Sequence, residues 1–403
     1  MWRRRLAITV RLCALALAVP ALGGNDCQPA RPEGEAAAEP HLVDDRGDVD
    51  SNGFAALVES VERPRGLHFV RRPELVLIDP SSRELTALAE EARALSPILN
   101  PEESKGSHPG AEAGRPGPPH GSDAPRAVAF PDFGRAQVVA TSPPDAMEVR
   151  RALGRLLDAQ QYPRLADAAP RLPGDAGIAI RALLAVSANA AASGSWFRNL
   201  HLPEADAPLK RPTLEGTFKG QPVFDSAIAP LQAGALLLLA LDDPETAFRR
   251  PPLSTKQLIS PAAYLASDRP IRLVGRPPVP ADCPILEDAS VGVLRLLLGL
   301  SATGGSVAGE TLASWKGDRL IQLACEDGRG PWIYVIEFAR ESAARDFEGR
   351  ADALLPQHLA RPTSSATLGR RVAAWSGMDP KVVTAFARAL VSHEVHSFEE
   401  WLP

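Results

Sequence analysis

Residues 147–194 read MEVRRALGRLLDAQQYPRLADAAPRLPGDAGIAIRALLAVSANAAASG, and this stretch decides the expected fold. Its first part repeats apolar residues at helical spacing, at Val149, Leu153, Leu156 and Leu157. Such a stripe predicts an amphipathic helix. Its second part, residues 175–192, is Ala, Ile, Leu, Val and Ser on nearly every side, which is typical of a buried helix. We therefore expect two consecutive helices at the centre of the protein.

The rest of the 403-residue chain alternates short apolar segments with turns. The expected elements are helices over 53–62, 83–95 and 226–241, strands over 75–78 and within 127–141, and a helix–strand–strand–helix–strand–helix series over 291–391. This order predicts an α+β fold. We expect a helical core with a small sheet over residues 53–270. A C-terminal α+β region, residues 271–403, is expected to pack on it.

Composition narrows the classes of function. Hydrophobic residues make up 45% of the chain, enough for a substantial core. The net charge of −5 argues against a nucleic-acid-binding surface, which is normally basic. The sequence contains neither a Gly-x-Ser-x-Gly nucleophile elbow nor a Gly-rich phosphate loop. We expect no nucleic-acid partner and no cofactor.

The N-terminus predicts a signal peptide over residues 1–24. Arginines at 3–5 precede an apolar run at 12–22, which is followed by small residues. The run is too short to span a membrane, and no later segment reaches the length of a transmembrane helix. Cys27 follows an Asn-Asp pair instead of the small residues of a lipoprotein site. We expect export as a soluble protein, either to the periplasm or as a secreted protein.

Two segments lack the apolar periodicity of ordered structure. Residues 25–52 are rich in Glu, Asp, Ala, Pro and Gly, which predicts an acidic disordered linker. Residues 97–126 are dominated by Pro and Gly, which predicts a disordered insertion.

The cysteines leave two alternatives open. Of the four, Cys13 would be removed with the signal peptide, so that Cys27, Cys283 and Cys325 remain. An odd number in an oxidising compartment leaves one cysteine without a partner. Cys283 and Cys325 form a disulfide, or they are two separate buried thiols.

Four short runs in the chain carry a resemblance to a known family. They are LDAQQY at 157–162, RALL at 181–184, PPLSTKQLISPAAYL at 251–265 and SWKGDR at 314–319. Together they resemble a family of exported bacterial and archaeal zincin-like metallopeptidases. In that family, one helix carries HExxH shortly before a Leu-Gln-Asp-Gln-His-Phe-like run, and the next carries Arg-Ala-Leu before an acidic element. The resemblance covers most of residues 53–391 and implies a zincin-like helical core.

The metal-binding residues of that family are replaced in this chain. The two histidines of HExxH fall on Arg151 and Arg155, the glutamate on Ala152 and the acidic element on residues 185–187, which begin with Ala185. A zincin needs neutral imidazoles, a third ligand and a carboxylate that takes a proton from metal-bound water. Arginine offers no lone pair to a metal, and alanine cannot act as a base. The resemblance therefore implies a degenerate member without zinc chemistry.

Arg151 and Arg155 are the sharpest local feature of the first helix. If the helix packs as in the family, both guanidinium groups point towards the vacated metal cleft. Two buried like charges are costly unless carboxylates or a bound anion offset them. One hypothesis is that they bind an acidic ligand or a partner group. The alternative is that Asp158 or another internal carboxylate pairs with Arg155, or that both arginines reach solvent.

A relocated metal site is the remaining possibility for metal chemistry. His393 and His396 are three residues apart, a spacing that faces one ion on a helix, with Glu399 one turn beyond. The competing interpretation is a solvated polar tail.

The sequence predicts a non-catalytic exported zincin-like protein with a role in binding or interaction. Its partner would be an unidentified protein or an acidic ligand. The alternatives are an active metal-dependent peptidase or hydrolase with relocated ligands, and a structural component of the cell envelope.

Overall fold

The computed structural model describes residues 40–94, 128–193, 229–280, 283–302, 309–325, 330–348 and 364–402. Their fold is α+β, as predicted. Residues 40–403 form one compact unit. The expected signal peptide and the insertion at 97–126 lie outside the described residues.

Part of the expected linker, residues 25–52, is ordered. Leu42 is buried in an apolar cluster with the first helix, α1 (Ser51–Glu62). Asp50 caps this helix by accepting a hydrogen bond from the backbone N–H of Asn52. The prediction of disorder was wrong for residues 40–52, because average composition does not register one buried leucine and one helix cap.

The two helices expected in 147–194 form the centre of the fold as α4 (Ala146–Gln161) and α6 (Gly174–Ala192), which pack against each other. A short helix, α5 (Pro163–Ala168), lies between them in the chain and was not predicted. A Cβ atom on Gly154 would lie 2.7 Å from the Cβ of Ala191. Glycine at this position therefore permits the close approach of α4 and α6.

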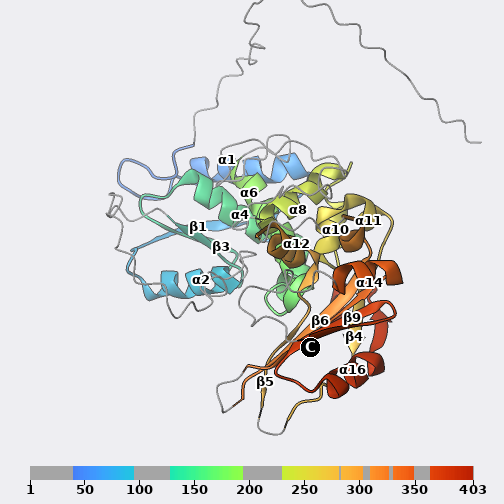
Figure 1. Cartoon of the computed structure of the whole chain (residues 1–403). Helices are drawn as coiled ribbons and strands as arrows, with labels where there is room; N and C mark the ends of the chain where they lie inside the picture. The colour runs from blue at the N-terminus through green and yellow to red at the C-terminus, as the bar shows by residue number, and fades with distance from the viewer. Residues whose placement is uncertain are drawn as a thin grey trace, which may run out of the picture. The chain divides into compact units, whose positions relative to one another are not determined.

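Further helices cover this pair. α1 packs against α4, and α8 (Ala229–Ala240) packs against α6 (Figure 1). Among the described helices, α6 alone is long and apolar enough to cross a membrane, and 78% of its apolar window is buried inside the protein.

A three-stranded sheet lies beside α4. Its strands are β1 (Glu74–Ile78), β2 (Ala129–Asp132) and β3 (Gln137–Thr141), in the order β1-β3-β2. β3 is parallel to β1 and antiparallel to β2. Figure 1 shows the sheet between α4 and α2 (Arg83–Ala94), and both helices contact β2. These elements confirm the predicted small sheet.

The run at 251–265 contains α10 (Thr255–Ile259) and α11 (Pro261–Leu265), which follow α9 (Thr246–Arg249). The polar side chains of α10, Thr255, Lys256 and Gln257, are buried and hydrogen bonded. Lys256 donates from Nζ to Asp268 at 2.7 Å and to the backbone carbonyl of Trp315 at 2.8 Å. The run therefore has a structural role.

The C-terminal region contains a five-stranded antiparallel sheet in the order β5-β6-β7-β9-β8. The strands are β5 (Ile285–Ala289), β6 (Trp315–Leu323), β7 (Trp332–Phe338), β8 (Ser364–Leu368) and β9 (Arg371–Ser376). The helices of this region are α12 (Gly292–Ala302), α13 (Gly309–Ala313), α14 (Glu341–Glu348) and α16 (Pro380–Ala389).

The central strand β7 is buried along its whole length. Trp332, Tyr334 and Ile336 belong to the cluster that contains α6, α8 and α14. Ile333 and Val335 belong to a second cluster with α16 on the other face. Side chains alternate along a strand, so β7 contributes to two cores at once.

The chain ends in a strand and a single 3-10 turn. β10 (Val391–Glu394) pairs antiparallel with β4 (Ile271–Val274), and η2 (Phe398–Trp401) follows. Neither strand was predicted from the sequence, which indicated a solvated polar tail after residue 391.

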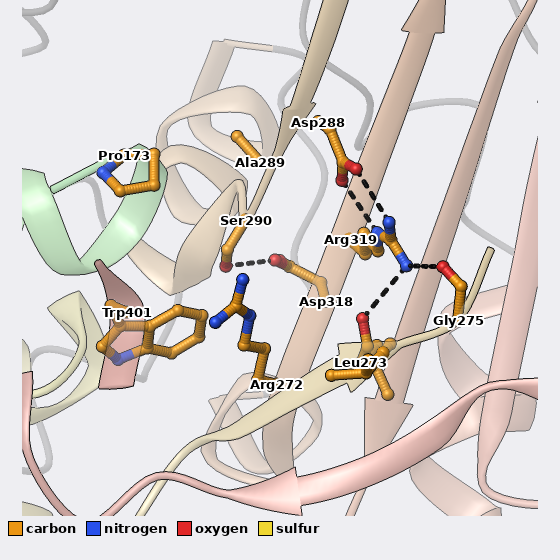
Figure 2. A pocket seen from close by; sticks show the side chains of 11 residues that line it. Pro173, Arg272, Leu273, Gly275, Asp288, Ala289, Ser290, Asp318, Arg319 and Trp401 are labelled. Atoms are coloured by element: carbon orange, nitrogen blue, oxygen red, sulfur yellow. Dashed lines mark hydrogen bonds and ion pairs between the residues drawn. The ribbon is translucent and has the colours of Figure 1, made fainter. Parts of the chain in front are cut away.

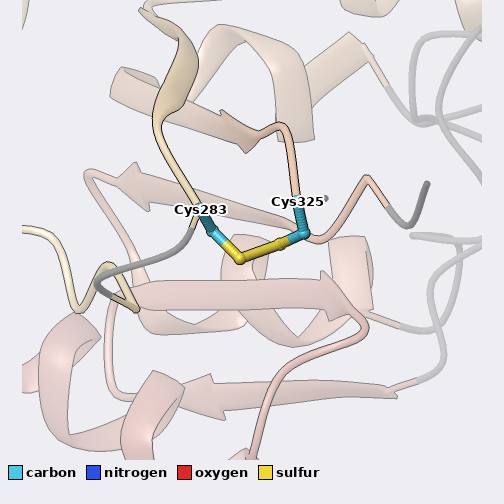
Figure 3. Close-up of a disulfide and its surroundings, with 2 residues drawn as sticks. All are labelled: Cys283 and Cys325. Carbon is cyan, nitrogen blue, oxygen red and sulfur yellow. A yellow bond between two sulfur atoms is a disulfide. The ribbon is translucent and has the colours of Figure 1, made fainter. Parts of the chain in front are cut away.

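Cys283 and Cys325 are joined by a disulfide with an S–S distance of 2.01 Å (Figure 3). It links the segment before β5 to the segment after β6, across 42 residues of sequence. Of the two alternatives left open by the sequence, the structure contains the disulfide.

Candidate functional site

A cavity of about 410 Å³ lies beside α4, α5 and α6. Arg155 and Ala185 both line it. These are the positions onto which the resemblance carries the second histidine and the start of the acidic element. The wall is mainly apolar and includes Phe133, Leu156 and Leu184. Its size is within the range of cavities that bind small molecules.

Arg155 provides the cavity with a positive charge. It makes no hydrogen bond or ion pair with any described residue. Burial lowers the pKa of this guanidinium, and the nearby charge of Arg151 lowers it further, while Glu148 opposes both effects. An arginine nevertheless stays protonated in proteins. Arg155 is thus a charged, partly buried donor group that no side chain of the described residues neutralises.

Arg151 is placed differently. It forms an ion pair with Glu148, one turn earlier on α4, and its Nε donates to Oδ1 of Asn189 at 3.0 Å. Arg151 is not among the residues that line the cavity. The expectation that both arginines face the same cleft therefore fails for Arg151, because two partners on α4 and α6 hold it elsewhere.

The resemblance carries the glutamate of HExxH onto Ala152. This residue is 1% exposed and packs in the apolar cluster formed by α1, α4 and the small sheet. A carboxylate at this position would be buried without a polar partner, at a high cost.

The residue that pairs with Asp158 is Arg65, not Arg155. Arg65 lies in η1 (Arg63–Arg65), and its side chain is 1% exposed. It donates from Nη1 to Asp158, and from Nε and Nη2 to the two carboxylate oxygens of Glu245 at 2.7 and 3.0 Å. The suggestion that Asp158 neutralises Arg155 is therefore wrong.

Aromatic residues complete this buried cluster. The hydroxyl of Tyr162 donates to Glu245, and the guanidinium of Arg65 lies 5.0 Å from the ring centroid of Phe248. Tyr162 and Phe248 are stacked, with their centroids 5.2 Å apart. We name Arg65, Asp158, Tyr162, Glu245 and Phe248 the Arg65 cluster. It ties η1, α4 and the segment around α9 together beside the cavity.

One oxygen of the Arg65 cluster has no partner among the described residues. Oδ2 of Asp158 is buried and makes no hydrogen bond there, and Asp158 is among the residues that line the cavity. Burial raises the pKa of this carboxyl, while the charge of Arg65 and hydrogen bonds from Arg65 and Ser187 oppose the rise. Arg155 is therefore the cationic group of the cavity, whereas the carboxylate of Asp158 is enclosed in the Arg65 cluster.

Comparison with protein families, curated proteins and solved structures finds no match to this chain. The site must therefore be interpreted from its own geometry.

The proposed relocation of a metal site depended on helical spacing, which is wrong for this segment. His393 lies in β10, opposite Arg272 of β4, and His396 lies two residues beyond the strand. In an extended chain, residues three apart point to opposite faces. Among the described residues, no group of three or more His, Cys, Asp or Glu side chains is arranged to hold a metal ion.

A second cavity, of about 160 Å³, lies beside β4, β5 and β6 (Figure 2). Its charged groups already have partners. Arg319 forms a two-pronged ion pair with Asp288 and donates to the carbonyls of Leu273 and Gly275. Arg272 donates to the carbonyl of Glu400. Nothing in this cavity requires a ligand.

Asp318 of the same cavity has a structural role. It accepts five hydrogen bonds, from Ser290 Oγ, the backbone N–H groups of Val291 and Gly292, Trp315 Nε1 and Tyr334 OH. The last two residues of the SWKGDR run therefore hold the start of α12 and the edge of the sheet. The run is explained by packing, without a ligand.

Gly292 begins α12 in a left-handed conformation, with φ +78°. A Cβ atom there would lie 1.7 Å from Oδ1 of the buried Asp175. We expect Gly292→Ala to lower the free energy of unfolding by about 3 kcal/mol, through backbone strain and displacement of that carboxyl. Urea denaturation measures the loss.

Gly369→Ala is the matched control for that substitution. Gly369 has φ +67°, and its Cβ position has no heavy atom within 4 Å. This variant should lose only about 1 kcal/mol, the cost of the backbone conformation alone. Equal losses at both positions would contradict a steric role for Asp175.

Proposed function

We propose that this chain is an exported, non-catalytic binding protein whose cavity beside α4 and α6 binds the carboxylate of a small ligand. The observation that carries the proposal is Arg155, a charged guanidinium that lines a mainly apolar cavity without a partner among the described residues. An arginine in such surroundings gains most from an anion, because a planar guanidinium matches the geometry of a carboxylate.

The residues at the positions that correspond to HExxH support the part of this proposal that the protein is non-catalytic. A zincin-like scaffold would place a general base at Ala152, whose methyl group is enclosed in apolar core. Arg151 and Arg155 stand where metal ligands would be needed, and neither has a lone pair to offer. The disulfide between Cys283 and Cys325 supports export, because disulfides persist mainly in oxidising compartments.

Titration with 4-methylpentanoate tests the proposal, since this probe joins a carboxylate to a branched apolar chain. We expect binding by calorimetry, and we expect Arg155→Ala to weaken it about 10- to 150-fold. A hydrogen bond to a charged group is worth about 1.5–3 kcal/mol, which corresponds to that loss.

Arg151→Ala is the matched control, because Arg151 lies one turn away on α4 but is paired with Glu148 and Asn189. It should leave the affinity within about threefold of the starting value, well below the effect of losing a charged hydrogen bond. An affinity for 4-methylpentanoate that Arg155→Ala does not change would contradict the proposed site. Stoichiometric zinc together with peptidase activity in the purified protein would favour an active hydrolase instead.

A further inference from the structure

Most polar side chains in the wall of the cavity beside α4 and α6 are already engaged by the protein. Gln160 donates from Nε2 to the backbone carbonyl of Arg71 at 3.0 Å and accepts from the backbone N–H of Arg71 at 2.8 Å. The carboxylate of Asp158 is enclosed in the Arg65 cluster. Among the described residues of the wall, Arg155 is therefore the cationic side chain that can pair with a polar group of a ligand.

The remaining charged residue of the described wall is Asp167 of α5, which is exposed and negative. A second carboxylate on the ligand would meet this like charge. Any second polar group buried in the cavity would lose its water without gaining a partner, which is costly. The ligand that fits this wall has a single polar end, its carboxylate.

The apolar wall continues beyond Arg155 over three helices. On α4 it includes Ala159, one helical turn further along, and on α5 it includes Pro163 and Ala166. Leu184 of α6 lies in the same wall. A hydrocarbon chain attached to the carboxylate therefore finds apolar contacts on α4, α5 and α6.

The cavity is large for a short acid. An apolar cavity of about 150 Å³ is enough to hold benzene, whereas this one has a volume of about 410 Å³. A ring or a branched chain of about six carbon atoms would leave much of it unfilled, so a chain of roughly 8–12 carbon atoms suits it better. Unfilled space contributes no contacts to a ligand.

We propose that the ligand is a medium-chain fatty acid, an inference that rests on the carboxylate binding proposed above. Its carboxylate pairs with Arg155, and its saturated chain lies on the apolar wall formed by α4, α5 and α6. Removal of the chain from water supplies most of the affinity, because each buried methylene increases the affinity about fourfold.

A series of straight-chain acids tests this inference by calorimetry on the full chain. Decanoate should bind with one molecule per chain and at least about 30-fold more tightly than hexanoate, because it buries additional methylenes. Decanedioate is the matched control, since it has the carbon chain of decanoate and a second carboxylate at the far end. It should bind no more tightly than hexanoate.

The outcomes of this series separate the two proposals. Equal affinities for hexanoate and decanoate would show that the fatty-acid inference is wrong while carboxylate binding stands. Equal affinities for decanedioate and decanoate would overturn the requirement for a single polar end. If no acid of the series binds, the proposed function fails as well.

Two variants locate the bound acid in the cavity. Arg155→Ala should weaken decanoate binding about 10- to 150-fold, and unchanged binding would mean that decanoate associates elsewhere on the protein. Ala185 lines the cavity, so Ala185→Leu narrows it and should remove most of the gain in affinity from hexanoate to decanoate. A full gain in folded Ala185→Leu would overturn the assignment of the chain to this wall. Where Ala185→Leu does not fold, the acid series and Arg155→Ala still decide the inference.

Discussion

Arg65→Met is expected to lower the free energy of unfolding by about 3–5 kcal/mol, the usual cost of removing one partner from a buried ion pair. Arg65 pairs with both Asp158 and Glu245, and its side chain is 1% exposed. Methionine fills part of the same volume but leaves two carboxylates without their counter-charge. Thermal and urea denaturation at neutral pH measure the loss.

The loss should depend on pH with a definite sign. Burial already raises the pKa of Asp158, and Arg65 opposes that rise. Without Arg65 the pKa rises further, so the folded state binds a proton more readily than the unfolded state. The stability of Arg65→Met should therefore recover as the pH falls from neutral towards the unfolded pKa of aspartate, about 4.

Two further variants separate charge from packing. Arg65→Lys keeps the positive charge but loses the two-pronged contact with Glu245, so it should recover only part of the stability. Adding Asp158→Asn and Glu245→Gln to Arg65→Met removes the uncompensated charges and should restore stability relative to Arg65→Met alone. A loss below about 1 kcal/mol for Arg65→Met, the range of exposed ion pairs, would contradict the central role of Arg65.

The helical centre of the fold was accessible from the sequence because its signal is local. The stripe containing Leu153 and Leu157 repeats at helical spacing, and both side chains are fully buried in α4. The apolar character of 175–192 likewise predicted a buried helix, which α6 confirms. The strands β4 and β10 were missed because each has only four residues, β10 is mostly polar, and the two pair across a long stretch of sequence.

The Arg65 cluster could not be found in this way. Arg65 meets Asp158 across 93 residues and Glu245 across 180 residues of sequence. In the sequence, Arg65 stands in a polar turn, and its neighbours give no sign of burial. Only tertiary contact reveals that this residue, and not a neighbour on α4, pairs with Asp158.

The candidate site was predicted only in part for the same reason. Periodicity places Arg151 and Arg155 on one face of α4, but it cannot decide which of them has a partner. Glu148 and Asn189 bind Arg151, whereas Arg155 has no such partner among the described residues and lines the cavity. The difference depends on Asn189 of α6, and its position follows from the packing of two helices.

Asp175 is expected to make the protein more stable as the pH falls from about 7 to about 4. It lies in the first turn of α6, fully buried, and accepts hydrogen bonds from the backbone N–H and the hydroxyl of Thr255. Burial raises the pKa of its carboxyl from 3.8 to about 7, the bonds from Thr255 oppose the rise, and the negative charge of Asp318 adds to it. The positive charge of Arg295 lowers this pKa, but not enough to cancel the rise.

The sign follows from proton binding. Between the unfolded pKa of 3.8 and the folded pKa of about 7, the folded state holds a proton that the unfolded state has released. Each unit of pH in this window changes stability by up to about 1.4 kcal/mol, so this carboxyl costs about 4 kcal/mol above pH 7 relative to pH 4. Below pH 4 both states are protonated, and above pH 7 both are ionised, so the contribution of Asp175 levels off at either end.

Asp175→Asn measures this contribution together with its coupling to Asp318, because carboxyls that do not interact with Asp175 titrate alike in both proteins and cancel in the difference. The amide oxygen can accept from the backbone N–H of Thr255 while the amide nitrogen donates to its hydroxyl oxygen, so the link to α10 is preserved. The free energy of unfolding of the variant minus that of the unmodified chain should increase by about 4 kcal/mol between pH 4 and pH 7.5. Urea titrations across this range measure the difference, and a difference independent of pH would show that folding does not raise the pKa of Asp175.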